Sequence, residues 1–263
     1  MILFDSHSHY DDTRFEREFD GGRDAAIRLS FEKGVCGIIN VATNRENAKT
    51  TIALAEKYDS IFAAVGYHPC DCQELPEDDI DGALADCEAL LSHPKVVAIG
   101  EIGLDYHYDD TVKERQKYFF EKQLECALKH DIPVIIHDRD AHGDCLETVK
   151  KYKGVRGVFH SFSGSAEMAR ELLELGWYIS FGGPVSYKNA NNVKRAAAAV
   201  PLDRVLIETD CPYLPPVPHR GEINYSAYMF HTLEALADAM GESPETVADA
   251  TVRNTKKLFG IEL

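Results

Sequence analysis

Eight short apolar runs, rich in β-branched residues, alternate with amphipathic stretches along the whole chain. The runs are MILFD, GIINVA, IFAAVG, VVAIGE, PVIIH, GVFHSF, YISFG and VLIETD. Nearly continuous apolar runs of this length are typical of strands buried on both faces of a parallel sheet. Eight such strands, separated by about as many helical segments, indicate an α/β protein, a single (β/α)8 TIM barrel over residues 1–263. A doubly wound open sheet is the main alternative, but no Gly-rich phosphate loop follows the first run.

Several helix boundaries carry their own signals. Thr111 and Glu114 have the spacing of a capping box at the start of a long helix. Ser165 precedes an amphipathic stretch and is placed to cap it. Ser243 and Pro244 combine an N-cap residue with proline at the first helical position, which predicts the start of the last helix.

Composition narrows the environment and the partners of the chain. The net charge of −16 argues against long-range attraction to polyanions, although bound divalent cations would make a site locally positive. The chain has no apolar run long enough to span a bilayer and no secretory signal, so we expect a cytoplasmic protein without a membrane partner. The 7 cysteines are scattered without a Cys-x-x-Cys pair. Cys70 and Cys72 could bind a soft metal ion, but the spacing rules for zinc sites favour two ordinary thiols beside a loop.

Residues of the metal-binding type stand where the predicted strands end. They are His7, His9, Glu101, His137, His160 and Asp210. Side chains at positions i and i+2 of a strand share a face, so the two histidines of the first strand can approach one ion together. Each residue alone has a structural explanation as a hydrogen-bonded histidine or a helix cap. Together, at the rim where barrel enzymes build their sites, they predict a metal centre.

The ligand types also indicate which ions this centre takes. Imidazole and carboxylate ligands without thiolate suit Zn²⁺, Mn²⁺, Mg²⁺, Fe²⁺ or Ni²⁺. Six ligands exceed the needs of one catalytic zinc ion. They fit two divalent metal ions that share a bridging carboxylate and activate a water molecule.

Six segments of the chain resemble the TatD family of metal-dependent hydrolases, the TatD-type DNases among the amidohydrolase-like TIM barrels. They are FDSHSH, GYHP, EIGLDY, IIHDRDA, FHSFSGS and ETDCPYLPPVPHRGEIN, and the resemblance runs from residue 2 to the C-terminal NTKKLFG. It implies a first metal held by His7, His9 and Asp210. It also implies that Glu101 bridges to a second metal, which His137 and His160 hold.

The resemblance further implies an activity. The family acts as nucleases, chiefly by 3′-to-5′ removal of nucleotides from DNA and sometimes from RNA. In this chain it implies that activated water attacks a phosphodiester, with Asp210 as the general base and Glu101 as the other catalytic residue. Single-stranded DNA or RNA ends are then more suitable substrates than duplex, and a monomer is expected.

Other positions of the same motifs have weaker assignments. Candidates for contacts with substrate phosphate are His68, His219 and Arg220. The arginine guanidinium can donate two parallel hydrogen bonds to phosphate oxygens. A structural role remains the alternative for His68, and loop bracing remains the alternative for Arg220. Asp105 and Arg139 are expected to orient metal ligands through hydrogen bonds.

Two further functions stay open. With the same metals, the chain could hydrolyse an amide, ester or lactone, such as an aminoacyl ester on tRNA. Related amidase barrels commonly bridge their metals with a modified lysine after the fourth strand, whereas this chain has Glu101 there, which favours phosphodiester cleavage. A non-catalytic scaffold is the third alternative; loss of a ligand would indicate it, and all six are present.

Overall fold

The computed structural model describes residues 1–263, and all eight predicted strands form in it. They are β1 Leu3–Ser8, β2 Val35–Val41, β3 Ile61–Val65, β4 Val96–Asp105, β5 Val134–Arg139, β6 Gly157–Phe159, β7 Tyr178–Phe181 and β8 Val205–Ile207. One sheet contains them in chain order, and their pairs are parallel. Ser8 at the end of β1 also pairs with Cys211 beyond β8. Sequential parallel strands that return to the first are the topology of a (β/α)8 barrel, so the predicted α/β TIM-barrel fold is confirmed.

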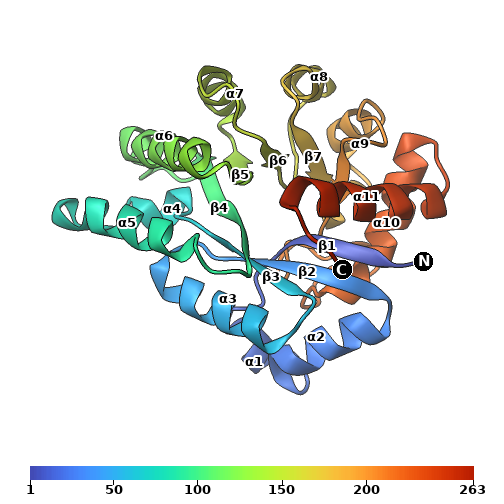
Figure 1. Ribbon diagram of the computed structural model, residues 1–263. Helices are drawn as coiled ribbons and strands as arrows, with labels where there is room; N and C mark the ends of the chain where they lie inside the picture. The colour runs from blue at the N-terminus through green and yellow to red at the C-terminus, as the bar shows by residue number, and fades with distance from the viewer. The chain divides into compact units, whose positions relative to one another are not determined.

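Helices follow the strands in the alternating order (Figure 1). The α-helices are α1 Arg14–Glu18, α2 Gly22–Glu32, α3 Arg45–Lys57, α4 Pro69–Cys72, α5 Ile80–Leu90, α6 Lys113–His130, α7 His142–Lys151, α8 Ala166–Glu174, α9 Asn191–Ala197, α10 Met229–Met240 and α11 Pro244–Phe259. Short 3-10 turns are η1 Glu77–Asp79, η2 Gly183–Ser186 and η3 Ser226–Tyr228. None of these helices is both long enough and apolar enough to cross a bilayer.

The structure tests the predicted helix starts. Ser165 accepts a hydrogen bond from the Met168 amide at 3.2 Å, and Ser243 caps α11 in the same way, so both predicted caps are confirmed. The capping box at Thr111 is wrong, because α6 begins at Lys113. The Thr111 hydroxyl instead donates to the Tyr108 carbonyl at 2.7 Å, so it stabilises the preceding turn.

The chain forms two compact units. The first unit contains residues 1–40 and 160–263, with β1, β7 and β8, and the second contains residues 41–159, with β3 to β6. The single domain over residues 1–263 therefore stays a prediction. In the first unit, α11 (red in Figure 1) packs against β1 and β8. The fully buried side chains of the first unit include Leu3, Phe4, Ile27 and Leu206.

In the second unit, helices α3, α6 and α7 pack against strands β3, β4 and β5 (Figure 1). In the long helix α6, Phe119, Phe120 and Leu124 are at most 1% exposed, whereas Leu128 is 41% exposed. This burial removes three large apolar side chains from water, each worth about 1.5–3 kcal/mol. It holds α6 along β4, the strand that contains Glu101.

Strand β4 extends four residues beyond the predicted end at Glu101. Ile102 and Leu104 are buried and pair with β5, so apolar burial and backbone pairing continue the strand to Asp105. The register shifts between Ile99 and Ile102, next to Glu101. Gly103 has a φ of +144° and lies so close to β5 that an added Cβ would stand 2.0 Å from the His137 carbonyl oxygen.

We expect Gly103→Ala to prevent stable folding or to lower the free energy of unfolding by more than about 3 kcal/mol. Both the positive φ and the backbone contact oppose a Cβ. Gly143→Ala is the control, because Gly143 lies in α7 with nothing within 4 Å of an added Cβ. It should be neutral or stabilising by up to about 1 kcal/mol. Thermal unfolding of both variants checks this, and a Gly103→Ala protein as stable as Gly143→Ala would contradict it.

Candidate metal centre

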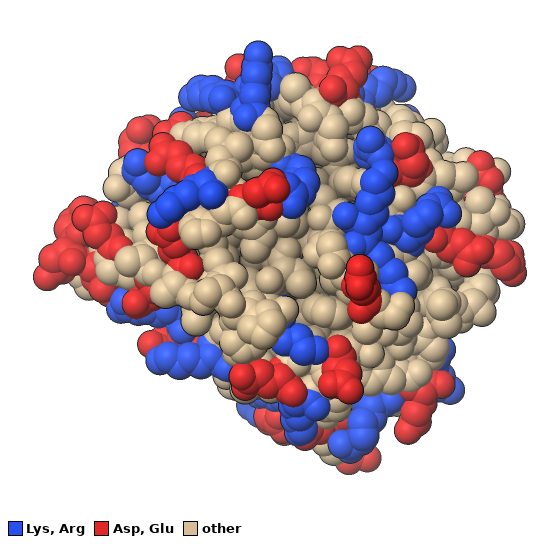
Figure 2. Space-filling view, viewed as in Figure 1, with Lys and Arg blue, Asp and Glu red and all other residues tan.

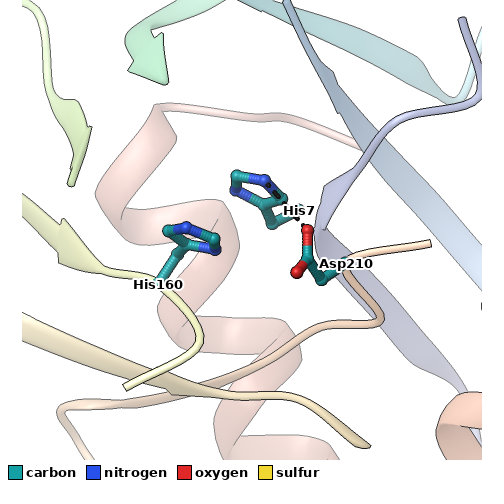
Figure 3. Close-up of side chains that lie close together, drawn as sticks. All are labelled: His7, His160 and Asp210. Atoms are coloured by element: carbon teal, nitrogen blue, oxygen red, sulfur yellow. Dashed lines mark ion pairs between the residues drawn. The ribbon is translucent and has the colours of Figure 1, made fainter. Parts of the chain in front are cut away.

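The first unit gathers three donor atoms at the end of β1. His7 Nε2 and His9 Nε2 lie 3.0 Å apart, and Asp210 Oδ1 lies 3.7 Å from the first and 3.4 Å from the second. Figure 3 shows His7, His160 and Asp210 directed toward one another. Both histidines are buried and the Asp210 side chain is 14% exposed, so the donors face a site with limited access to solvent.

Backbone hydrogen bonds fix the two segments that carry these donors. The Asp210 amide donates to the His7 carbonyl at 3.0 Å, and the His9 amide donates to the Cys211 carbonyl at 2.8 Å. Asp210 adopts the left-handed region with a φ of +57°, which aspartate tolerates better than most residues. Such uncommon backbone geometry is concentrated at functional sites.

The charge state of Asp210 suits a ligand or a base. Burial works to raise the pKa of Asp210, but its hydrogen bond with His9 and the neighbouring imidazoles hold that pKa below its usual value. The carboxyl group is therefore ionised at neutral pH. An ionised carboxylate can bind a cation or accept a proton.

Asp5 stabilises the segment that contains Asp210. Its carboxylate accepts hydrogen bonds from the Thr209 amide at 3.0 Å and from the hydroxyls of Thr209 and Ser226, both at 2.6 Å. Burial raises the pKa of Asp5 to about 7, against the opposing effect of these hydrogen bonds. The side chain is fully buried and holds Thr209, the residue before Asp210.

His160, the residue directly after β6, lies against the same cluster. Its ring stacks on His7 with centroids 3.9 Å apart and planes 9° from parallel. His160 Nδ1 lies 3.3 Å from Glu208 Oε1, which also accepts a hydrogen bond from the Ser161 amide at 2.6 Å. This contact turns His160 Nε2 away from Glu208 and sets the ring orientation.

Glu208 is a residue of the site that sequence reasoning missed. It is fully buried, directly after β8, and its Oε2 makes no hydrogen bond. The available signal was a carboxylate inside the apolar run VLIETD, two residues before Asp210. A carboxylate that orients a ligating histidine is a recurrent feature of metal sites.

The second unit has ligand-type side chains of its own on β4 and β5. Glu101 Oε1 lies 2.6 Å from His137 Nδ1 and 3.7 Å from His68 Nε2. Asp105 Oδ2 lies 3.1 Å from His137 Nε2, on the other side of the ring. The Glu101 side chain is 4% exposed, which for a carboxylate calls for partners of opposite charge.

Asp105 is the residue that fixes His137. Burial works to raise the pKa of Asp105, but its hydrogen bond to His137 and the amide of His107 hold that pKa below its usual value. The ionised carboxylate thus faces one ring nitrogen while Glu101 faces the other. His68 caps the short helix α4 by accepting from the Cys70 amide at 3.1 Å, and its ring lies edge-on to His137.

Three other predicted residues lie outside these two sets of contacts. His219 stacks on Tyr228 with centroids 3.7 Å apart, in the segment after β8. The Arg220 guanidinium lies 4.1 Å from the centre of the Tyr187 ring. Arg139, at the end of β5, is exposed with its guanidinium 5.6 Å from the centre of the Tyr108 ring, and none of the hydrogen bonds described above involves its side chain.

The donor set of the first unit fits a divalent ion. Ligand atoms bound at about 2.0–2.2 Å lie about 3–3.6 Å apart around one ion, close to the 3.0–3.7 Å between His7 Nε2, His9 Nε2 and Asp210 Oδ1. The donors are two imidazoles and a carboxylate without thiolate, a combination that zinc and harder divalent ions accept. The second unit offers the same donor types in Glu101 and His137.

We expect Glu208→Gln to weaken metal binding about 10- to 100-fold, because the charged partner of His160 Nδ1 is lost. Glu234→Gln is the matched control, since Glu234 also faces a histidine, His231, but is 72% exposed. Competition with a chelator measures the affinity of each protein. Equal affinities of Glu208→Gln and the unaltered chain would rule out this role of Glu208.

Comparison with known proteins shows which family this chain matches. A family model described as TatD related DNase matches residues 4–260. The chain is 40% identical over 262 residues to the metal-dependent hydrolase YabD of Bacillus subtilis, covering 99% of this chain and 100% of YabD. It is 37% identical over 264 residues to the metal-dependent hydrolase YcfH of Escherichia coli K12, covering 100% and 97%. The crystal structure of YjjV, a TatD homologue from E. coli, superposes with a TM-score of 0.90 at 33% identity and covers 99% of this chain and 98% of YjjV.

Proposed function

The chain belongs to the TatD family of metal-dependent hydrolases, as its motifs predicted, and from that premise we propose that it is a phosphodiesterase that removes nucleotides from the 3′ ends of DNA or RNA. The observation that carries the proposal is the donor triangle of His7, His9 and Asp210. The family name, TatD related DNase, supports nucleic acid as the substrate.

Six residues would hold two divalent ions in this proposal. His7, His9 and Asp210 serve the first ion, His137 and His160 serve the second, and Glu101 is the ligand that both share. Ions bound there would stabilise negative charge on a phosphoryl group and lower the pKa of water. Zn²⁺, Mn²⁺, Mg²⁺, Fe²⁺ and Ni²⁺ all accept this set of donors.

In this proposal, individual side chains of the chain have different roles in the reaction. Asp210 is ionised and its side chain is only 14% exposed, so its lone pairs can accept the proton of the attacking water. Glu208 and Asp105 hold the rings of His160 and His137 in fixed orientations. His68, His219 and Arg220 remain the proposed contacts for substrate phosphate.

The charge of the protein favours single-stranded nucleic-acid ends over duplex as the substrate. The net charge is −16, and on the face in Figure 2 acidic side chains are interspersed among the basic ones. Duplex binding usually depends on an extended basic surface that releases counterions from DNA. A single strand that enters a local site needs fewer such contacts. All seven cysteines are free thiols, which suits the cytoplasm as the working compartment.

An amide or ester hydrolase, for instance one that acts on an aminoacyl ester of tRNA, is the second candidate. The same ions would polarise a carbonyl group as well as a phosphoryl group. Glu101 on β4, in the place where related amidase barrels carry a modified lysine, favours the phosphodiesterase.

A substrate panel separates the two candidates. The metal-reconstituted protein is incubated with single-stranded DNA, single-stranded RNA, an aminoacyl-tRNA and small esters and amides. We expect nucleotide release from the single strands to exceed ester and amide turnover by at least about 10²-fold in kcat/KM. Ester or amide turnover without nucleotide release under any divalent ion would reject the phosphodiesterase in favour of the second candidate.

A further inference from the structure

A third group of ligand-type side chains lies between helices α5 and α6 in the second unit. Glu88 belongs to α5, and Cys126 and His130 belong to α6. Figure 1 shows these two helices side by side. The ligand atoms of the three residues all lie within 4.8 Å of one another. None of them belongs to the ligand sets of the proposed hydrolase site.

The spacing on α6 places two of these donors on one face. Cys126 and His130 are four residues apart, so they are neighbours along the helix surface. His130 Nε2 lies 2.7 Å from Glu88 Oε1, which joins the last turn of α6 to α5. A sulfur, a nitrogen and an oxygen donor therefore converge from two helices.

The surroundings favour a cation at this point. Lys129 Nζ already lies 2.6 Å from the same Glu88 oxygen, so the carboxylate attracts positive charge. Helix α6 ends at His130, and the carbonyl groups of a last turn carry partial negative charge. Beside the group is a hollow of about 250 Å³, lined by Cys87, Glu88, Cys126 and Lys129 among others, which gives an ion a path of entry.

We propose that Glu88, Cys126 and His130 form a peripheral site for Zn²⁺ or another thiophilic divalent ion that ties α5 to α6. Thiolate, imidazole and carboxylate are the three ligand types that Zn²⁺ takes in proteins. Binding forms one sulfur–metal bond, releases the Cys126 thiol proton to solvent and displaces the Lys129 ammonium from Glu88. Water completes the coordination on the open side.

Cobalt(II) spectroscopy tests this site without relying on hydrolysis. A thiolate ligand gives bound Co²⁺ an intense near-ultraviolet charge-transfer band, whereas imidazole and carboxylate ligands do not. The six proposed ligands of the hydrolase site contain no thiol, so the band reports the peripheral site. The titration compares the unaltered chain with Cys126→Ser, His130→Asn and Cys70→Ser. Cys70 is the matched thiol control, because it lies beside Asp105 in the other ligand set.

We expect the unaltered chain and Cys70→Ser to give the band, Cys126→Ser to lose it, and His130→Asn to need at least about tenfold more Co²⁺ to reach it. Cys126→Ser should keep the hydrolase activity, which separates this inference from the proposed function. No band from the unaltered chain at saturating Co²⁺ would overturn the site. A band that survives Cys126→Ser, or one that Cys70→Ser removes, would overturn it as well.

Discussion

Replacing Asp210 by asparagine is expected to lower kcat for nucleotide release by about 10²–10⁴-fold. The carboxylate is ionised and largely shielded from solvent, and its Oδ1 lies 3.4 Å from His9 Nε2, so it is placed to serve as a ligand and as a proton acceptor. Asparagine has nearly the same shape, but its amide cannot accept a proton at neutral pH. The backbone hydrogen bond from residue 210 to the His7 carbonyl does not depend on the side chain. The fold should therefore persist while activity is lost.

Steady-state kinetics on single-stranded DNA, with thermal unfolding in parallel, measure this prediction. Asp203→Asn is the matched control, since Asp203 is 70% exposed and pairs with Arg204 at the surface. The control should retain both the activity and the stability of the unaltered chain. If Asp210→Asn retained more than about a tenth of kcat, Asp210 could not be the general base.

Replacing Glu101 by glutamine is expected to lower metal content and activity together. In the proposed centre this carboxylate is the ligand that both ions share, and its neutral amide analogue binds divalent ions more weakly. Loss of the charge that holds the ions should reduce activity by at least about 10²-fold. The variant keeps the size of the buried side chain, so β4 should retain its pairing with β5.

Elemental analysis and nuclease assays on the same sample test this second prediction. The matched control is Glu147→Gln, because Glu147 is 69% exposed and pairs with Lys150. We expect the control to bind as much metal as the unaltered chain. Full activity in Glu101→Gln would remove the shared-ligand assignment, whereas loss of activity with unchanged metal content would give Glu101 a role other than binding.

The strand pattern and the grouping of His7, His9 and Asp210 were predictable from the sequence for physical reasons. Strands buried on both faces need continuous apolar residues, so each of the eight interrupts the polar sequence visibly. His7 and His9 at i and i+2 follow from the strand period, and Asp210 follows the last apolar run. Contacts local in sequence, such as the caps at Ser165 and Ser243, were equally accessible.

Features that depend on distant contacts were not predictable. Glu208 makes its contacts only because His160 and the Ser161 amide lie beside it, 48 and 47 residues away in the chain. The extension of β4 to Asp105 depends on its pairing with β5. The Thr111 hydroxyl had a choice of backbone partners, and the turn at Tyr108 supplied the nearer acceptor.

Stepwise addition of Mn²⁺ to the metal-free protein tests whether the chain is a two-metal phosphodiesterase. Bound Mn²⁺ per chain is measured alongside the shortening of a 5′-labelled single-stranded DNA, and Mn²⁺ is chosen because it avoids thiolate sites. We expect nucleotides to leave from the 3′ end and activity to rise as the second equivalent binds. Full activity with one bound ion would contradict the two-metal centre. No nucleotide release at saturating Mn²⁺, or under any other divalent ion, would contradict the phosphodiesterase itself.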